Sequence, residues 1–256
     1  MKLIILTQEK VHTGNLILVN AHYPYHDLPV KLLEKVHVNN PDILLIGRIV
    51  NSFTCLLEKV NGWDHITAVS GWRSMDEQIK IYEGSLLENG QVFTEKYVAL
   101  PGHSEHQTGL AIDLALTTDN IDFIRPDFPY TGICQIFRNT APIYGFIERY
   151  PKEKETITGI AHEPWHFRYV GTPHAKIMSE KGLVLEEYID FLKDYVYGVS
   201  PYIYVTGGQK NMISYLPAVP DAETRLTIDD RFPYYISGNN IDGFIITQWR
   251  NSDGPE

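Results

Sequence analysis

The residues whose types and spacing could do chemistry lie in three short stretches, two of which carry histidines together with carboxylates. His106 is followed by Asp113, and Glu163 is followed by His166. Two imidazoles and one carboxylate could bind a metal ion, which leaves one carboxylate over. A catalytic zinc needs this set, because three protein ligands leave a fourth position for water, whose pKa the metal lowers toward ~7. The spare carboxylate could then accept the proton of that water.

The same stretches allow other ligand assignments. The chain has 10 histidines, which create many accidental combinations, and His103 and His162 compete with His106 and His166 for the ligand roles. Ordinary surface or core histidine and aspartate residues are the alternative to a metal site. Spacing alone therefore leaves the ligand set open.

The third stretch, residues 70–78, supplies a cation at the junction of an expected strand and an expected helix. Arg73 lies in the tight turn between them, which would aim its guanidinium off the edge of the sheet. An arginine in such a turn is most often only a surface residue. Beside a metal-activated water, however, a fixed guanidinium suits the oxyanion that forms when an amide is attacked.

The backbone around Asp113 predicts how it meets a histidine. In a strand over residues 109–113, Gly109, Ala111 and Asp113 share one face, which small side chains keep clear. A bend at the start of this strand would bring His106 beside the Asp113 carboxylate.

The backbone around Glu163 differs from that of a helical metalloprotease motif. Pro164 forces Glu163 toward extended geometry, so the two histidines of an HExxH helix face are excluded here. We expect Glu163 on a loop just before a strand at 166–170, where a loop carboxylate could reach a water on the same metal.

Hydrophobic spacing predicts helices and short strands along the chain. We expect helices at residues 28–36, 41–60, 75–87 (capped by Ser74), 132–139 and 173–195. We expect strands at 65–70, 108–116, 145–149 and 166–170, and short β pieces at 202–205, 212–216, 234–237 and 244–249. Two domains are therefore expected: residues 1–198, which carry the candidate site, and a small β module at 199–256 that holds no cluster of ligating residues.

Composition describes an ordinary globular chain and excludes some classes of partner. Hydrophobic residues make up 43% of the 256 positions, and 32 acidic against 22 basic residues give a formal net charge of -10. This balance argues against broad binding to nucleic acid or to anionic lipid, because both need clustered cations.

The cysteines and the N-terminus give no sign of export. Cys55 and Cys134 cannot form a disulfide framework and are expected to be reduced core thiols. The apolar run near the N-terminus is shorter than the ~7–15 residues of a signal-peptide core. No later stretch approaches the ~18 apolar residues of a membrane span. We therefore expect a cytoplasmic protein without a membrane anchor.

Three motifs resemble the signatures of the zinc D-Ala-D-Ala carboxypeptidases and dipeptidases, the group of VanY, VanX and bifunctional VanXY peptidases. The motifs read SGWRSxxxQ at residues 70–78, SEHQTGLAID at 104–113 and EPWHFRYVG at 163–171. They occur in the order of the family, and the resemblance covers residues 11–195. Three separated motifs without a mismatch at a functional position are far more specific than any one of them.

The resemblance implies an α+β fold with a central antiparallel sheet and surrounding helices, shared with the zinc-binding signalling domain of hedgehog proteins. It also implies one zinc ion per chain, bound by His106, Asp113 and His166, with Glu163 as the general base. Arg73 would polarise the scissile carbonyl and stabilise the tetrahedral intermediate. The other matching positions would contact the substrate: Ser104 and Gln78 at its C-terminal carboxylate, Trp165 as a pocket wall or a core aromatic beside the site, and Ser70 through a hydrogen bond.

Carboxypeptidase-like motifs without an N-terminal anchor resemble the fused VanXY type. That resemblance implies a small peptide substrate: free D-Ala-D-Ala and the C-terminal D-Ala of peptidoglycan precursors, cleaved in the cytoplasm, which alters the target of vancomycin-type glycopeptides. Two alternatives stay open. One is a housekeeping peptidoglycan D,D- or L,D-carboxypeptidase, and the other is a non-catalytic zinc-containing module that binds a peptide.

Overall fold

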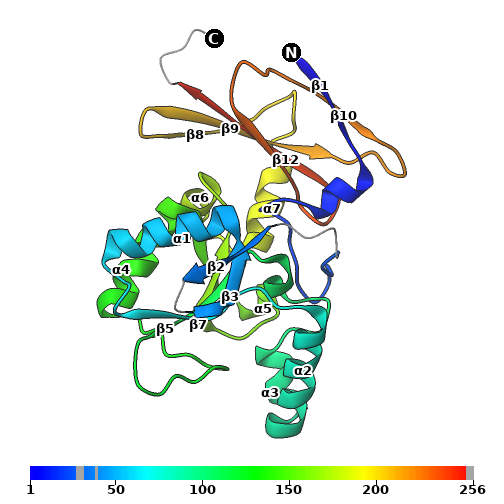
Figure 1. Ribbon diagram of the computed structural model, residues 1–256. Coiled ribbons are helices and arrows are strands. Elements are labelled where there is room, and N and C mark those ends of the chain that lie inside the picture. The colour runs from blue at the N-terminus through cyan, green and yellow to red at the C-terminus, as the bar shows by residue number, and fades with distance from the viewer. Residues whose placement is uncertain (27–31, 38–39, 252–256) are drawn as a thin grey trace. The chain divides into compact units, whose positions relative to one another are not determined.

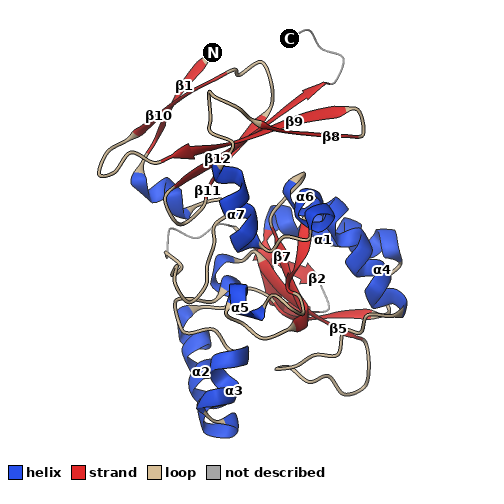
Figure 2. Ribbon diagram, turned by 180° about the vertical axis from the view of Figure 1, so that it is seen from behind, coloured by secondary structure: helices blue, strands red, loops and turns tan. Residues whose placement is uncertain are grey.

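The computed structural model describes residues 1–26, 32–37 and 40–251 (Figure 1 and Figure 2). These residues form two compact units. One unit consists of residues 19–184, and the other combines residues 1–18 with the chain from residue 185 onward. Helices and antiparallel sheets occur together, so the expected α+β class is confirmed.

A four-stranded antiparallel sheet forms the centre of the unit at residues 19–184. Its strands lie in the order β4 (Ile66–Ser70), β5 (Ala111–Leu116), β7 (Glu163–Tyr169) and β6 (Phe146–Tyr150). A separate hairpin pairs β2 (Leu33–His37) with β3 (Asn40–Ile46). The helices are α1 (Gly47–Val60), α2 (Met75–Asn89), α3 (Gln91–Tyr97), α4 (Gly132–Thr140), α5 (Glu155–Thr158) and α6 (His174–Lys181). Two short 3-10 helices are η2 (Glu105–Thr108) and η3 (Ala141–Tyr144).

One face of the central sheet is apolar and packs against helices. Ile112 and Phe167 stand opposite each other on β5 and β7, and both are fully buried. The ring of Phe137 on α4 lies 5.0 Å from that of Phe167, and Phe53 on α1 lies 6.1 Å from Phe146, measured between ring centres. Because side chains alternate along a strand, this core face leaves the opposite face to polar residues.

The register of the sheet sets three polar residues side by side on that opposite face. Asp113 on β5 stands opposite His166 on β7 and, on its other side, opposite Ser70 at the end of β4. Directly opposite residues have Cβ atoms about 4.5–5.5 Å apart. A shift of one residue in the pairing of β5 would turn Asp113 toward the apolar core, so the hydrophobic pattern of the strand also fixes this polar row.

A capping box fixes the start of the helix that follows β4. The Ser74 hydroxyl accepts the backbone N–H of Glu77, and the Glu77 carboxylate accepts the backbone N–H of Ser74. The two donors at the helix N-terminus are thereby satisfied, which determines where α2 begins. The expected cap and helix are confirmed, and the short turn between β4 and α2 carries Arg73.

Most of the expected elements in this unit are present. The four expected strands are confirmed as β4 to β7, and the helix expected at 132–139 is confirmed as α4. One strand boundary differs, because β7 already begins at Glu163, which was expected on a loop. Extended geometry before Pro164 suits a strand as well as a loop, and Glu163 pairs with Tyr150 of β6.

The helices expected at 28–36 and across 41–46 are wrong where the structure describes these residues. Residues 33–37 and 40–46 are strands, and α1 begins only at Gly47; residues 28–31 lie outside the described part. An unbroken apolar run fits a buried strand and a helix equally well. Residues 40–46 form a strand because they pair with β2, and because the Leu44 oxygen accepts a backbone hydrogen bond from Trp72 N–H.

Two smaller expectations are also corrected. The helix expected at 173–195 is divided at Gly182, which has a left-handed φ of 64° and ends α6. Cys134 is a buried thiol as expected, but Cys55 is exposed on the outer side of α1. An apolar neighbourhood in sequence does not bury a helical residue that faces away from the core.

The second unit is built of β strands from both ends of the chain. Strand β1 (Lys2–Leu6) pairs with β10 (Thr224–Ile228), and a second sheet has the order β11 (Tyr234–Gly238), β12 (Gly243–Asn251), β9 (Gln209–Pro217) and β8 (Tyr202–Thr206). The unit also contains η1 (Gln8–His12) and α7 (Leu185–Lys193). Its core includes Leu6, Leu226, Phe244 and Ile246.

The chain therefore divides at different residues from the expected boundary at 198/199. Residues 1–18 belong with the C-terminal β strands, because β1 pairs with β10 along its whole length. The change of composition after residue 198 indicates the β-rich region but does not show that a strand from the N-terminus completes it.

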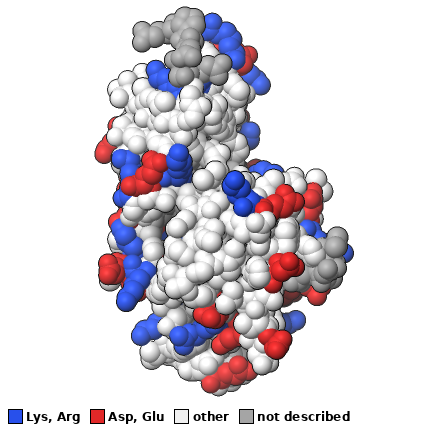
Figure 3. Space-filling view, turned by 90° about the vertical axis from the view of Figure 1, so that its left-hand side faces the viewer, with Lys and Arg blue, Asp and Glu red and all other residues white. Residues whose placement is uncertain are grey.

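Charges of both signs are mixed on the surface. Figure 3 shows Lys and Arg side chains scattered among Asp and Glu on the face in view, rather than gathered into a basic patch. Within the described residues, no helix has the length and apolar character needed to cross a membrane.

We predict that Gly109→Ala lowers the free energy of unfolding by more than the about 1–2 kcal/mol that a side chain costs in the left-handed region, because the added Cβ also meets tight packing. Gly109 has a φ of 69° at the turn from η2 into β5, and an added Cβ would lie 3.2 Å from side-chain atoms of Ile46 and Leu33. Urea denaturation measures the change. Gly159→Ala is the matched control, because Gly159 has a similar φ of 74° but open space around it. Equal losses in both variants would contradict the tight packing at Gly109.

Candidate active site

The structure brings the three expected metal ligands together on the polar face of the central sheet. The Nε2 of His106 lies 3.1 Å from Asp113 Oδ2, and the Nδ1 of His166 lies 2.9 Å from Asp113 Oδ1. One ligand atom from each of the three residues lies within 4.8 Å of the others, and all three side chains are buried. In the described part of the chain, no other three His, Cys, Asp or Glu side chains meet in this way.

Local structure aims His106 at this point. The 3-10 helix η2 carries His106, and the left-handed Gly109 turns the chain into β5, whose third residue is Asp113. The Nδ1 of His106 lies 2.6 Å from the backbone oxygen of Gly71, which accepts its N–H. This hydrogen bond leaves Nε2 without a proton, directed at the other two ligand atoms. The expected bend between His106 and the strand is confirmed.

The two histidines have different proton affinities. Burial, together with the nearby Arg73 guanidinium, lowers the pKa of His106. Burial also acts to lower the pKa of His166, but hydrogen bonding to Asp113 and the charges around the ring raise it to about 9. His106 is therefore ready to donate a lone pair, whereas a cation at this site competes with a proton for His166.

The donor set fits a zinc ion. Two buried imidazole nitrogens and one buried carboxylate oxygen converge, and among the residues that the structure describes no fourth ligand joins them, which is the usual set in catalytic zinc sites. The hydrogen bond from His106 to Gly71 O is of the kind that orients a metal-bound histidine. The observed residues thus agree in type, number and orientation with a metal centre.

Glu163 lies beside the donor set but outside it. Its Oε2 is 3.9 Å from His166 Nδ1, and the side chain is buried at the first residue of β7. Burial and the nearby Asp113 carboxylate raise the pKa of Glu163 to about 8. The backbone next to it is held as well, because Arg138 donates to the oxygen of Pro164 at 2.9 Å.

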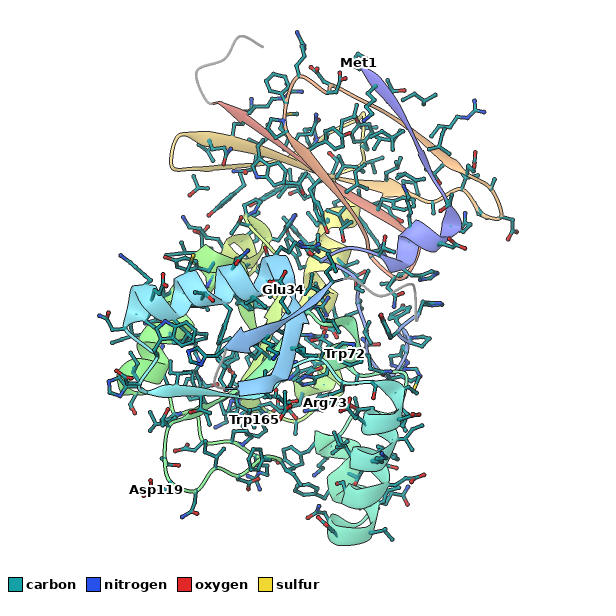
Figure 4. All side chains as sticks on the ribbon, viewed as in Figure 1. Met1, Glu34, Trp72, Arg73, Asp119 and Trp165 are labelled. Atoms are coloured by element: carbon teal, nitrogen blue, oxygen red, sulfur yellow. The ribbon has the colours of Figure 1, made fainter. Side chains whose placement is uncertain are left out.

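Arg73 is fixed at the edge of the same group. Its Nη2 donates to Asp113 Oδ2 at 3.0 Å, and its Nε donates to the hydroxyl of Ser70 at 2.9 Å. Its backbone N–H also bonds to His106 O. The expected turn therefore directs the guanidinium at the ligand set rather than into solvent. Arg73 and Trp165 line one cavity and lie near each other in Figure 4.

A cavity of about 370 Å³ opens at these residues. Ser70, Ser104 and Trp165, three of the four residues expected to contact a substrate, line it together with the ligand set, Glu163 and Arg73. On the other side it extends along α2 and the end of α3, past Lys80, Ile81, Gly84, Ser85, Glu88, Tyr97, Val98 and Ala99. A ligand in the cavity would thus lie between the polar face of the sheet and α2.

Gln78, the fourth residue expected to contact a substrate, lies outside the cavity. Its side chain is fully buried, does not line the cavity and donates from Nε2 to the backbone oxygen of Ala99 at 2.8 Å. Ala99 does line the cavity, so Gln78 contacts the cavity wall from behind and is not part of its surface.

The two competing histidines lie outside the cavity lining. The Nδ1 of His103 lies 2.7 Å from the backbone oxygen of Asn20, and the ring of His162 stacks on Tyr130, whose hydroxyl lies 2.7 Å from its Nε2. The structure thus brings His106 and His166 together with Asp113 and leaves His103 and His162 apart from them; that His106 and His166 are metal ligands stays a prediction.

Three buried charged residues behind the ligand set were not predicted. Glu105, Arg149 and Arg168 are fully or almost fully buried, and each arginine forms an ion pair with Glu105. Burial acts to raise the pKa of Glu105, but the two guanidiniums hold it well below its usual range. The sequence contained a signal, since Glu105 directly precedes His106, but the partners come from β6 and β7 and are distant in sequence.

A metal donor set with a separate carboxylate and a fixed guanidinium, all facing one cavity, is typical of a metal-dependent hydrolase. A family model described as VanY, D-alanyl-D-alanine carboxypeptidase, matches residues 44–172. The bifunctional D-Ala-D-Ala dipeptidase and D-Ala-D-Ala carboxypeptidase VanXYC of Enterococcus gallinarum is 39% identical over 185 residues, which make up 70% of this chain and 95% of that protein. The chain therefore belongs to the VanY family of D-alanyl-D-alanine carboxypeptidases and is a peptidase.

Two solved structures resemble the chain to different extents. The vancomycin resistance D,D-dipeptidase VanXYg, in complex with a D-Ala-D-Ala phosphinate analog, matches with a TM-score of 0.95 and 52% identity over 97% of this chain and 99% of that one. A variant of the vancomycin resistance D,D-pentapeptidase VanY from a VanB-type resistance cassette, in complex with Zn(II), matches with a TM-score of 0.59 and 31% identity over 68% of this chain and 98% of that one.

We predict that Glu163→Gln stabilises the metal-free protein at pH 8 and does so much less at pH 5. The raised pKa keeps Glu163 protonated in the folded state, while the unfolded chain ionises it near 4.5. The contribution of Glu163 to the free energy of unfolding of the wild type is therefore lost as the pH rises from about 4.5 to about 8. Glutamine does not ionise, so the variant keeps its stability over this range. Thermal melts in chelator should show a difference on the order of a few degrees at pH 8. If the difference in melting temperature between Glu163→Gln and the wild type does not grow with pH, the raised pKa of Glu163 is contradicted.

Proposed function

We propose that this protein is a zinc-dependent D,D-peptidase that hydrolyses D-Ala-D-Ala and removes the C-terminal D-Ala of peptidoglycan precursors, in support of vancomycin-type glycopeptide resistance. The observation that carries the proposal is the buried group of His106, Asp113 and His166, with Glu163 and Arg73 at the same cavity. Membership of the VanY family and the full-length likeness to VanXYg support it. Following the fused VanXY type, the proposed compartment is the cytoplasm.

In this proposal His106, Asp113 and His166 hold one zinc ion per chain. The ion supplies Lewis acidity, which makes water a competent nucleophile near neutral pH and polarises the substrate carbonyl. The protein supplies the geometry: His106 is held by Gly71 O, and Asp113 is held by its place opposite His166 in the sheet.

Glu163 is proposed as the general base. It is a buried carboxylate beside the ligand set, with its Oε2 3.9 Å from His166 Nδ1, and in its ionised form it can take a proton from water and give it to the leaving amine. A raised pKa favours that second role, because a base must hold its proton long enough to return it. Its first-residue position on β7 and the neighbouring contact from Arg138 to Pro164 O keep it in place.

Arg73 is proposed to stabilise the negative charge that develops on the scissile carbonyl oxygen. Two of its nitrogens are already bound, one to Ser70 and one to Asp113, so the guanidinium plane needs little reorganisation when substrate enters. Ser104 lines the cavity nearby and is proposed to contact the substrate carboxylate, with Trp165 as a wall and Ser70 as the support of Arg73. Gln78 is proposed to act indirectly, through Ala99.

The extent of the cavity supports action on a peptide longer than a dipeptide. It continues from the ligand set along α2 as far as Glu88, with Ile81 and Gly84 between. A free dipeptide would fill the part around the ligand set, and the rest can accept further residues of a precursor.

A substrate panel tests the proposal. Purified protein should release D-Ala from D-Ala-D-Ala and from a UDP-linked pentapeptide that ends in D-Ala-D-Ala. It should release the terminal D-Ser or D-lactate more slowly from precursors that end in those residues. A tetrapeptide with an L,D bond is included, because preferential cleavage there would identify an L,D-carboxypeptidase instead. Binding of these peptides without any product would identify a binding module.

We predict that chelation abolishes the release of D-Ala and that added zinc restores it. Glu163→Gln should bind zinc like the wild type but lower kcat by about 10²–10⁴-fold, as expected when a general base is removed. Metal content by atomic emission and turnover on D-Ala-D-Ala are the two measurements. Normal turnover by Glu163→Gln would refute the assigned role.

We also predict that Arg73→Ala lowers kcat on D-Ala-D-Ala by about 10²–10³-fold at saturating zinc, the usual cost of losing an oxyanion donor. Arg73→Lys should recover little of this, because one ammonium cannot bond Ser70 and Asp113 in the same planar arrangement. Lys80→Ala is the control, since Lys80 is an exposed cation that lines the same cavity. Similar losses in the Lys80 and Arg73 variants would point to a general charge effect.

A further inference from the structure

Behind the ligand set lies a cluster of three buried charged residues, Glu105, Arg149 and Arg168, here called the Glu105 cluster. Glu105 Oε1 accepts from Arg149 Nε at 2.8 Å and from Arg168 Nη1 at 2.7 Å. All three side chains have no exposed surface. Burying three charges is costly unless geometry and pairing are good, so such a cluster needs a structural or functional reason.

The cluster lies on the same face of the sheet as the ligand set. Arg168 follows His166 by two residues on β7 and so shares its face, and Arg168 stands opposite Ala111, two residues before Asp113 on β5. Glu105 comes from the other direction, on η2, where it directly precedes His106. The cluster therefore connects the segment that carries one histidine to the strand that carries the other.

The Glu105 cluster contacts the imidazole of His166. Glu105 Oε2 lies 3.4 Å from His166 Nε2, while His166 Nδ1 lies 2.9 Å from Asp113 Oδ1 on the other side of the ring. The ring thus lies between two carboxylates. Tyr150 limits its rotation further, with ring centres 4.9 Å apart, and Arg149 lies over the ring of Tyr150 at 4.9 Å.

This arrangement determines which nitrogen of His166 is available. An imidazole that donates Nε2–H to a carboxylate keeps Nδ1 for a metal, and a flipped ring would present the wrong nitrogen. His106 is held in the opposite sense, with Nδ1 at Gly71 O and Nε2 toward Asp113. The two ligands therefore present different nitrogens, and each needs its own orienting acceptor.

We propose that Glu105 is a positioning residue for the metal centre: it accepts the Nε2 proton of His166 and so directs Nδ1 at the metal, while Arg149 and Arg168 hold the Glu105 carboxylate in place. This assignment rests on the proposed zinc site. Acceptors of this kind fix the tautomer and orientation of a metal-binding histidine, and their loss typically weakens metal binding by about 10–100-fold.

The test measures zinc affinity, not turnover. Wild type and Glu105→Gln are titrated with zinc against a chromophoric chelator, after circular dichroism has shown that both are folded. We expect about 10–100-fold weaker zinc binding in Glu105→Gln. Glu88→Gln is the matched control, because Glu88 is an exposed glutamate that lines the same cavity and undergoes the same charge change; it should bind zinc like the wild type.

The outcomes separate the possible failures. If Glu105→Gln melts at a lower temperature but its folded form binds zinc within about twofold of the wild type, Glu105 serves only to compensate the two arginines, and the positioning role is wrong. A wild type that binds no zinc overturns the proposed function, and this assignment with it. Zinc binding without D-Ala release in the substrate panel overturns the proposed reaction and leaves the role of Glu105 intact.

A second measurement on the wild type keeps the proposal testable if Glu105→Gln does not fold. Long-range ¹H–¹⁵N NMR of the zinc-loaded protein distinguishes a protonated, a metal-bound and a free ring nitrogen. We expect a protonated Nε2 and a zinc-bound Nδ1 for His166, and the reverse for His106. Zinc on Nε2 of His166 would overturn the proposal without any variant.

Discussion

The pairing of Asp113 with His166 across β5 and β7 is the constraint on which the site depends. It is set by the apolar side of the same strands, where Ile112 stands opposite Phe167 and the ring of Phe167 packs against Phe137 of α4. Because faces alternate, burying the apolar residues necessarily aligns the polar ones. The chemistry of the site is thus positioned by the hydrophobic core, and the remaining groups are added from η2 and from the turn before α2.

The sequence predicted which residues of the site lie together more accurately than it predicted the secondary structure around them. Two histidines and two carboxylates restrict the chemistry, and the three motifs restrict the family. His106, Asp113 and His166 were therefore predicted as metal ligands from the sequence, and the structure brings them together. Periodicity was weaker evidence for residues 33–46, since an unbroken apolar run suits a strand or a helix until its backbone partners are known. The burial of Gln78 and the exposure of Cys55 depend in the same way on packing.

The Glu105 cluster shows why some functional contacts escape sequence reasoning. Glu105 lies inside a recognised motif, but its meaning comes from Arg149 and Arg168, which are brought to it by the pairing of β6 with β7. A buried carboxylate between two guanidiniums resists movement, because any displacement separates charges in a medium of low polarity. Rigidity of this kind suits the proposed zinc site, in which one carboxylate is proposed to stay free as the base.

Strand β1 has a consequence for how the polypeptide is made. Its partner β10 is separated from it by most of the chain, including every residue of the unit at 19–184. During synthesis all of residues 19–184 have been made before the ribosome produces β10, the partner strand of β1. The unit that contains β1 and β10 is therefore completed last, and we expect an N-terminal fusion or truncation to affect this unit rather than the proposed metal site.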